Sequence, residues 1–285
     1  MTAKKKKFIF LAIAAAVLVA LVIWIAWGNT AMELNTYTIS SLKLPESFDG
    51  YRIAHVSDLH NAEMGKDNET LLSMLRDADP DMIAITGDLI DSRNTDIEVA
   101  LQFVREAVKI APCYYVTGNH EARVNEYGEL KAEMEAAGVT VLEDVRNEIS
   151  MEGETITLIG VNDPSYQTDY LFGDAESVID AKLEELHTEN AGFTILLSHR
   201  PELFDTYADH DIDLVLSGHA HGGQFRLPFI GGLVAPNQGL FPEYDAGIFT
   251  DGNTNMIVSR GVGNSILPFR INNRPEVILV ELQIE

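Results

Sequence analysis

The chain has 285 residues, enough for one large domain, and 46% of them are hydrophobic. Its formal net charge of −24 at pH 7 argues against a nucleic-acid binder, because so acidic a surface repels a polyanion. A single cysteine, Cys113, excludes an intramolecular disulfide, so the core must supply the stability.

The first 30 residues differ from the rest of the chain. Residues 8–27 form an uncharged apolar run of 20 residues, long enough as a helix to cross a hydrocarbon layer of ~30 Å. Four lysines at positions 4–7 precede it, which predicts a cytoplasmic N-terminus and an extracytoplasmic remainder. Trp24 and Trp27 close the run and favour an uncleaved anchor in the cell membrane over a secretory signal cut near Ala31.

Residues 31–50 are predicted to form a linker and an edge strand, and an alternation of strand-like and helix-like stretches follows. The expected strands are residues 52–57, 81–86 and 114–117, and the expected helices are residues 68–75, 97–108 and 129–136. Such alternation is typical of βαβ units around a buried sheet, so the fold class is α/β.

The second half of the chain predicts mixed sheets. Short β-like runs occupy residues 139–161, followed by a helix at 175–186 and strands at 193–197, 212–216, 256–259 and 277–284. Residues 222–252 are rich in Gly and Pro and are predicted to form loops. Five apolar side chains of this stretch form either a satellite core or an apolar surface that faces the bilayer; they are Phe225, Phe229, Ile230, Leu233 and Phe241.

Five short segments place polar side chains directly after apolar strands. Because open α/β sheets deliver such residues to the crevice at the carboxyl ends of the strands, we expect them to converge. Five of the eight histidines fall in these segments, whereas His55, His187 and His210 do not. The candidate site residues are Asp58, His60, Asp88, Asp91, Asn119, His120, His199, His219 and His221.

The donor types predict a catalytic metal site. Oxygen and imidazole ligands without thiolate suit Mn, Fe or Zn, and the number of ligands implies two divalent metal ions with Asp88 as a bridge. Two such ions carry a charge of +4, and the carboxylates of Asp58 and Asp88 contribute −2, so the filled site has a net charge of about +2. Such a centre holds a phosphate group and lowers the pKa of bound water from 15.7 to roughly 7, which supplies hydroxide at neutral pH.

In their order along the chain, these segments resemble the signature of the calcineurin-like metallophosphoesterases: D-x-H, G-D, G-N-H-[DE], H and G-H-x-H. The similarity runs from about Tyr51 to the C-terminus, and it implies a four-layer α/β/β/α sandwich over residues 51–285. It implies that one metal is held by Asp58, His60, Asp88 and His221, and the other by Asp88, Asn119, His199 and His219. It also implies that His120 protonates the leaving oxygen and that Asp91 orients His120.

Residues beyond the last ligand resemble the bacterial membrane-anchored branch of this superfamily. The matching segments are Gly222-Gly223-Gln224 and Ser259-Arg260-Gly261. That branch is similar to enzymes that cleave UDP-2,3-diacylglucosamine, which implies a lipid-like phosphate ester as substrate. One departure is Ala220, where the family pattern has Thr; the change removes a hydroxyl but no metal ligand.

The sequence therefore predicts a dinuclear-metal phosphodiesterase or pyrophosphatase that acts on a lipid-like or cell-envelope phosphate ester by attack of metal-activated hydroxide. Two alternatives stay open. One is a phosphomonoesterase with a soluble substrate, and the other is a non-catalytic envelope module that binds metal and phosphate. Arg200 and Arg260 either contact the substrate or pair with a carboxylate.

Overall fold

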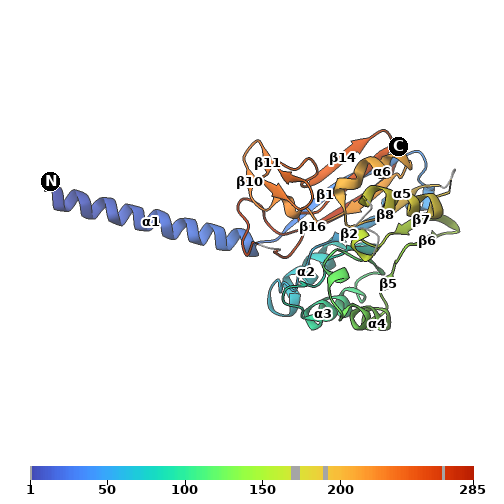
Figure 1. The fold of residues 1–285 in the computed structure, drawn as a ribbon, viewed down its shortest axis with the longest axis horizontal. Coiled ribbons are helices and arrows are strands. Elements are labelled where there is room, and N and C mark those ends of the chain that lie inside the picture. Colours follow the sequence, from blue (N-terminus) through green and yellow to red (C-terminus); the bar gives the residue numbers. More distant parts are fainter. Residues whose placement is uncertain (1, 168–173, 189–191, 265–266) are drawn as a thin grey trace.

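The computed structural model describes residues 2–167, 174–188, 192–264 and 267–285. Its first element, α1 (Ala3–Thr30), is a helix of 28 residues that projects from one end of the folded domain (Figure 1). Within the described part of the chain it is the one helix long and apolar enough to cross a membrane. At about 42 Å it exceeds the hydrocarbon thickness, and it is apolar on all sides, as a spanning helix must be.

The first sheet has six strands in the order β1-β16-β2-β3-β4-β5. Their bounds are β1 Glu33–Ser41, β16 Glu276–Ile284, β2 Arg52–Val56, β3 Met82–Thr86, β4 Cys113–Val116 and β5 Thr140–Val141. The run from β2 to β5 is parallel, whereas β16 is antiparallel to β2 and parallel to β1. The last strand of the chain thus ties β1, which follows α1, into the sheet.

The second sheet also has six strands, in the order β14-β15-β9-β8-β7-β6. Their bounds are β14 Gly247–Asp251, β15 Thr254–Val258, β9 Leu214–Ser217, β8 Thr194–Leu197, β7 Glu154–Gly160 and β6 Val145–Met151. Antiparallel hairpins β6–β7 and β14–β15 flank three parallel pairings. The prediction of mixed sheets is confirmed.

Helices cover the outer faces of both sheets (Figure 1). The first sheet packs against α2 (Glu69–Ala78), α3 (Ile97–Ala107) and α4 (Tyr127–Ala137), and the second against α5 (Ala175–Leu186) and α6 (Phe204–Asp209). A separate apolar cluster fills the space between the two sheets. Three cores between four layers confirm the predicted α/β/β/α architecture.

Alternation along β3 shows how the layers are built. Ile83 and Ile85 enter the core beneath the helices, whereas Met82 and Ala84 enter the core between the sheets. Because successive side chains point to opposite faces, a strand buried on both sides is a continuous apolar run. Full burial of each large side chain contributes about 1.5–3 kcal/mol. This packing fixes where β3 ends, and hence where the polar segment after it lies.

The stretch predicted to form loops contains more structure than its composition indicates. It holds two short hairpins, β10 (Arg226–Leu227) with β11 (Gly231–Gly232) and β12 (Val234–Ala235) with β13 (Gly239–Leu240), and it also holds β14. For β14 the loop prediction was wrong. The two-residue turn Gly252-Asn253 joins β14 to β15, and Gly followed by Asn between two strands is a hairpin signal.

Candidate metal centre

The candidate ligands lie in loops at the carboxyl ends of parallel strands. Asp58 and His60 follow β2, Asp88 follows β3, Asn119 and His120 follow β4, His199 follows β8, and His219 and His221 follow β9. Since β3 packs against β8 and β9 across the two sheets, loops distant in sequence meet at one edge of the sandwich. Each of these eight residues is at most 6% exposed.

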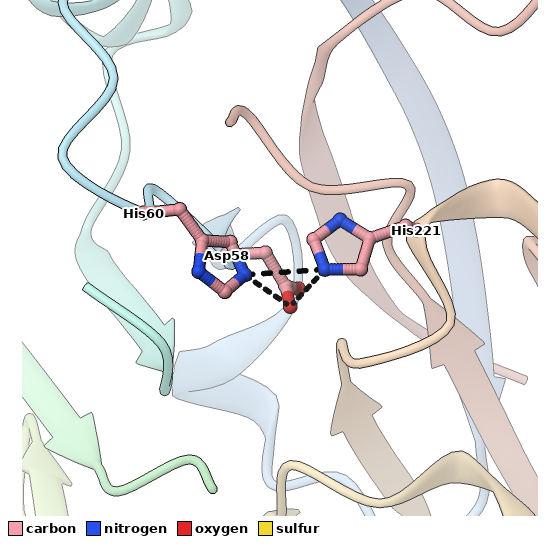
Figure 2. A group of neighbouring side chains, drawn as sticks. All are labelled: Asp58, His60 and His221. Atoms are coloured by element: carbon pink, nitrogen blue, oxygen red, sulfur yellow. Dashed lines mark hydrogen bonds and ion pairs between the residues drawn. The ribbon is translucent and has the colours of Figure 1, made fainter. Parts of the chain in front are cut away.

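Asp58, His60 and His221 form the first ligand cluster (Figure 2). Oδ1 of Asp58 lies 3.3 Å from Nε2 of His221 and 3.7 Å from Nε2 of His60. The two Nε2 atoms are 3.1 Å apart. Ligand atoms that share a metal ion at about 2.1 Å lie roughly 3.0–3.4 Å from one another, so the spacing of these three atoms fits one ion.

Asp88, His199 and His219 form the second cluster. Nε2 of His199 lies 3.2 Å from Oδ2 of Asp88 and 3.1 Å from Nδ1 of His219. One end of the Asn119 side-chain amide lies 2.8 Å from the same Nδ1, close enough for the amide oxygen to serve the same cation. Oδ2 of Asp88 is also 3.5 Å from Nε2 of His60, so Asp88 lies between the two clusters.

Backbone and hydroxyl donors hold the two carboxylates. The N–H of His219 donates to both oxygens of Asp58 at 3.2 and 3.1 Å, and Oγ of Ser57 donates to Oδ2 at 2.6 Å. The N–H of His120 donates to Oδ1 of Asp88 at 2.8 Å. Burial raises the pKa of both carboxyl groups, but the surrounding histidines, led by His221 for Asp58 and by His199 for Asp88, lower each pKa below its ordinary value. Both groups are therefore anionic and attract cations.

A backbone hydrogen bond sets the ring orientation of His199. Its Nδ1 lies 2.7 Å from the carbonyl oxygen of Thr86, and because a carbonyl only accepts, Nδ1 carries a proton and Nε2 faces the cluster. Metal-ligating histidines commonly have such an outer partner. Burial lowers the pKa of His199, but the neighbouring Asp88 carboxylate raises it to about 10 overall. This position thus favours a positive charge, whether a proton or a metal ion.

The local backbone around the ligands is strained. Positive φ angles occur at five of the seven proposed ligands: Asp58, His60, Asp88, His219 and His221. Each costs about 1–3 kcal/mol for a non-glycine residue, and such strain gathers at functional sites. Two glycines allow the loops to close, because a Cβ at Gly118 would lie 2.2 Å from Oδ1 of Asp88 and one at Gly218 would lie 2.3 Å from Oδ2 of Asp58.

His120 lies at the mouth of the centre, with its ring 4.5 Å from that of His60. Its Nδ1 accepts a hydrogen bond from the backbone N–H of Ser92 at 2.9 Å. Oδ1 of Asp91 lies farther away, 3.5 Å from Nδ1, and the Asp91 carboxylate is held by Nε and Nη2 of Arg93 at 2.9 and 2.6 Å. Burial lowers the pKa of His120 to about 4.

Glu121 is a structural residue that the sequence analysis left without a role. It is fully buried, and its carboxylate accepts hydrogen bonds from the N–H groups of Asp88 (2.9 Å), Gly118 (2.8 Å) and Ile90 (3.3 Å). Burial raises its pKa to about 7. Its place in the G-N-H-[DE] motif was the available signal. Glu121 ties the loop after β3 to the loop after β4, and so fixes Asp88 relative to His120.

The two arginines left open by the sequence analysis both pair with carboxylates. Arg200 is buried and its Nη2 donates to Oδ1 of Asp163 at 2.9 Å, while its Nη1 lies 3.1 Å from Nε2 of His219. Arg260 pairs with Glu33 and Glu276, each at 2.6 Å. Arg200 therefore borders the second ligand cluster, whereas Arg260 lies on the side of the domain near β1.

A cavity of about 290 Å³ opens onto the ligands. Three arginines line it together with ligand residues and the turn of a short hairpin; the lining residues include Arg93, Arg123, Arg200, His120, Pro236 and Asn237. Guanidinium groups in a partly buried cavity are well suited to phosphate oxygens. The cavity is thus lined both by guanidinium groups, which bind anions, and by the buried Asp88 carboxylate and histidine rings of the ligand clusters.

The sequence segments that carry these ligands match the pattern of one protein family. The calcineurin-like phosphoesterase model matches residues 51–223, more than half of the chain and all of the loops described above. The chain belongs to the calcineurin-like phosphoesterase family. Members of this family use divalent metal ions, and the buried nitrogen and oxygen donors of the two clusters fit such ions. Like other calcineurin-like phosphoesterases, the protein is a metal-dependent hydrolase of phosphoric esters.

Relatives of this calcineurin-like phosphoesterase include bacterial and animal proteins. The metallophosphoesterase YkuE of Bacillus subtilis is 30% identical over 88% of this chain and 86% of its own length. Phosphodiesterase YaeI of Escherichia coli is 29% identical over 81% of this chain and 82% of its own length. A Danio rerio transmembrane protein with a metallophosphoesterase domain is 30% identical over 85% of this chain and 55% of its own length.

Solved structures support the fold. TT1561 of Thermus thermophilus superposes with a TM-score of 0.51 over 75% of this chain and 90% of its own, at 16% sequence identity. At that identity the likeness concerns the fold alone. Together with the long apolar helix α1, the relatives named as transmembrane proteins fit a single-pass membrane protein.

Proposed function

We propose that this protein is a dinuclear-metal phosphodiesterase or pyrophosphatase that acts on a lipid-like or cell-envelope phosphate ester. The observation that carries the proposal is the position of Asp88, whose Oδ2 lies 3.5 Å from His60 and 3.2 Å from His199, between two buried ligand clusters. Paired metal ions are a common device for hydrolysing phosphate esters. YaeI, a relative named as a phosphodiesterase, supports a diester substrate.

The proposed ligands divide between two ions that share Asp88. One set is Asp58, His60, Asp88 and His221, and the other is Asp88, Asn119, His199 and His219. Bound divalent ions would neutralise the phosphoryl oxygens and supply hydroxide at neutral pH. Mn, Fe and Zn all suit this mixture of imidazole and oxygen donors.

The remaining chemistry falls to side chains around the cavity. The N–H of Ser92 occupies Nδ1 of His120, so Nε2 is the ring nitrogen that carries a proton, and we assign His120 to protonating the leaving oxygen. Asp91 is assigned to orienting the ring; because Nδ1 already accepts from Ser92, its carboxylate would act by holding the loop of residues 91–93 through the N–H of Arg93 and not by a direct hydrogen bond to the ring. Arg123 and Arg200 line the cavity and are placed to bind phosphate oxygens.

The anchor supports a substrate at the membrane. In the proposed topology, α1 crosses the cell membrane with the lysines at positions 4–7 in the cytoplasm and the catalytic domain outside. Residues 1–30 then form the anchor, residues 31–50 lead into the domain, and residues 51–285 form the catalytic domain. A tether of this kind keeps the active site close to lipid-linked and envelope esters.

Metal content and turnover of the purified full-length Asp88→Ala variant test the shared ligand. The wild type is expected to hold two divalent ions per chain, and the variant to lose metal and at least about 100-fold in turnover. Asp180→Ala, which removes a carboxylate on α5 outside the centre, is the matched control and should retain both ions. Two ions still bound to Asp88→Ala would contradict the proposed bridge.

The substrate class is tested separately with bis-p-nitrophenyl phosphate, p-nitrophenyl phosphate and a lipid pyrophosphate. Hydrolysis of the diester or of the lipid pyrophosphate supports the proposal. Turnover confined to soluble monoesters would establish the phosphomonoesterase alternative. Full metal content without turnover of any ester would establish a non-catalytic binding module.

A further inference from the structure

The two hairpins β10–β11 and β12–β13 present an unusual concentration of apolar side chains to solvent. Outside α1, the described residues include twelve large hydrophobic side chains that are exposed, and six of them lie between positions 227 and 241. Phe229 is fully exposed, and Leu240 is 70% exposed. We name these six side chains the apolar lip: Leu227, Phe229, Ile230, Val234, Leu240 and Phe241. Contiguous exposed apolar surface usually marks an interaction site.

The backbone of the apolar lip is strained where its aromatic rings are displayed. Phe229 has φ +69° and Phe241 has φ +55°. Bulky residues rarely adopt this conformation, and neither ring gains burial within the protein from doing so. Phe225 and Leu233, in contrast, are partly buried, and the ring of Phe225 packs 5.6 Å from that of Phe269. The inner apolar residues of the hairpins are thus partly buried in the fold, while the outer ones stay exposed.

The β10–β11 hairpin, which carries Leu227, Phe229 and Ile230 of the apolar lip, lies at the end of the domain from which α1 emerges (Figure 1). The N–H of Arg226, at the start of β10, donates to the carbonyl of Ile271 at 3.0 Å. The neighbouring residue, Arg270, exchanges two hydrogen bonds with the Asn29 side chain of α1, at 2.7 and 3.0 Å. One short segment therefore links the β10–β11 hairpin to the last turn of the anchor.

The anchor determines what faces this end of the domain. The guanidinium of Arg274 lies 4.7 Å from the ring of Trp27, so the last turns of α1 are held against the domain. Trp24 and Trp27 are aromatic residues of the kind that lies at the membrane–water interface. A bilayer crossed by α1 therefore begins beside the face that carries the apolar lip.

The same hairpins also border the active-site cavity. Pro236 and Asn237, in the turn between β12 and β13, line that cavity, and Nδ2 of Asn237 donates to Oε1 of Glu202 at 2.9 Å. Leu240 ends β13, Phe241 follows it, and both are exposed. The β12–β13 hairpin thus contributes both to the cavity lining and to the apolar lip.

We propose that the apolar lip inserts into the interfacial layer of the membrane that α1 crosses, and that it forms a route from the bilayer to the active-site cavity. The bilayer is the occupant that the position of α1 selects, and apolar side chains of this kind partition into its interface. A phosphate ester with acyl chains would keep the chains in the lipid while its phosphate reaches the cavity. This consequence for the substrate rests on the proposed function, whereas the insertion does not.

Insertion is tested on the full-length chain in lipid nanodiscs that hold one copy each. In a Cys113→Ser background, Phe229→Cys carries an environment-sensitive fluorophore, and Leu42→Cys is the matched control. Leu42 is 79% exposed and follows β1, about 30 Å along that strand from the end near α1. We expect a blue shift and quenching by nitroxide-labelled lipid at position 229 but not at position 42.

Two results would overturn the insertion. One is iodide quenching at position 229 equal to that at position 42, which means that the site is in water. The other is a blue shift without nitroxide quenching, which means that protein rather than lipid covers the label. Either result is independent of whether the protein hydrolyses any ester.

The route to the cavity is tested with Phe229→Ser/Ile230→Ser, a double variant at the tip of β10–β11. We expect hydrolysis of a vesicle-embedded diacyl phosphodiester to fall at least about tenfold, with turnover of soluble bis-p-nitrophenyl phosphate unchanged. Leu42→Ser should change neither rate. Equal losses on both substrates would overturn the route. A wild-type protein that inserts its lip but hydrolyses no lipid ester would leave the membrane contact intact and refute the proposed lipid substrate.

Discussion

At the scale of single residues, Asp88 depends on its neighbours for its conformation. Its φ of +52° is unfavourable, yet its N–H is bound by Glu121 and its Oδ1 by the N–H of His120. These contacts outweigh a cost of about 1–3 kcal/mol and keep the carboxylate between the two clusters. Buried hydrogen bonds thus fix the position of the residue on which the proposed metal bridge depends.

His120 gives a residue-scale prediction. Replacement by Ala removes the proposed proton donor but no proposed metal ligand, so kcat should fall by about 100-fold or more while two ions remain bound. Asp91→Asn should retain both ions and lower kcat by about tenfold, because only the orientation of the ring is affected. Metal analysis together with steady-state kinetics on bis-p-nitrophenyl phosphate measures both effects.

Ser92→Ala is the matched control for His120→Ala. It removes a hydroxyl that lies 3.2 Å from Nδ1 of His120 but leaves the backbone N–H that donates to the same atom. Its kcat should therefore stay close to that of the wild type. Unchanged kcat in His120→Ala would refute the proton-transfer role, and loss of metal in that variant would make His120 a ligand instead.

At the scale of elements, β2 carries a buried histidine outside the centre. By alternation His55 shares the face of Ile53 between the sheets, and its Nε2 lies 2.8 Å from the hydroxyl of Thr86. Burial lowers the pKa of His55 from 6.5 to about 3. His55 therefore stays neutral in the folded chain, whereas the same side chain binds a proton in the unfolded chain below pH 6.5.

This difference predicts a pH dependence of stability. Because the unfolded state binds one more proton between pH 6.5 and about 3, His55 weakens folding as the pH falls through that window. Between pH 7 and pH 5, the wild type should lose on the order of 2 kcal/mol more unfolding free energy than His55→Gln. Urea unfolding in detergent at both values measures the difference.

His210→Gln is the control for this comparison, because it also removes one histidine but at a partly exposed position, directly after α6 and 2.8 Å from Oδ1 of Asp180. Effects of acid on the ligand histidines are common to all three proteins and cancel. A wild type whose pH dependence equals that of His55→Gln would show that His55 does not remain neutral in the folded state.

At the scale of the whole molecule, the asymmetry of charge around α1 predicts the topology. The lysines at positions 4–7 lie in the first turns of α1, before its apolar run, and the acidic domain follows the helix. In spheroplasts of a bacterial host, Asn253→Cys should react with a membrane-impermeant maleimide, and Thr2→Cys should react only after permeabilisation. Cys113 provides little background because it is 1% exposed. The opposite labelling pattern would reverse the proposed orientation.

The sequence alone indicated the α/β fold class and the identity of the residues that converge, whereas the four layers were expected only from the resemblance to a family. Strand periodicity and short polar segments are local features, and each segment remains at the end of its strand whatever the rest of the chain does. The prediction missed β14 because its pairing with β15 and its Gly252-Asn253 turn outweighed a loop-like composition.

Only the tertiary structure decided which atoms meet. The placement of Oδ2 of Asp88 near both His60 and His199 depends on contacts between loops of different strands. So does the hydrogen bond at Nδ1 of His120, whose partner is the N–H of Ser92 and not the Asp91 carboxylate. Composition left the exposed aromatic residues of the hairpins with two interpretations. The structure places these hairpins beside the membrane-anchor helix α1. They lie there because residues near the C-terminus bind α1, although α1 is at the other end of the chain. Such long-range contacts arise from packing, which no local pattern encodes.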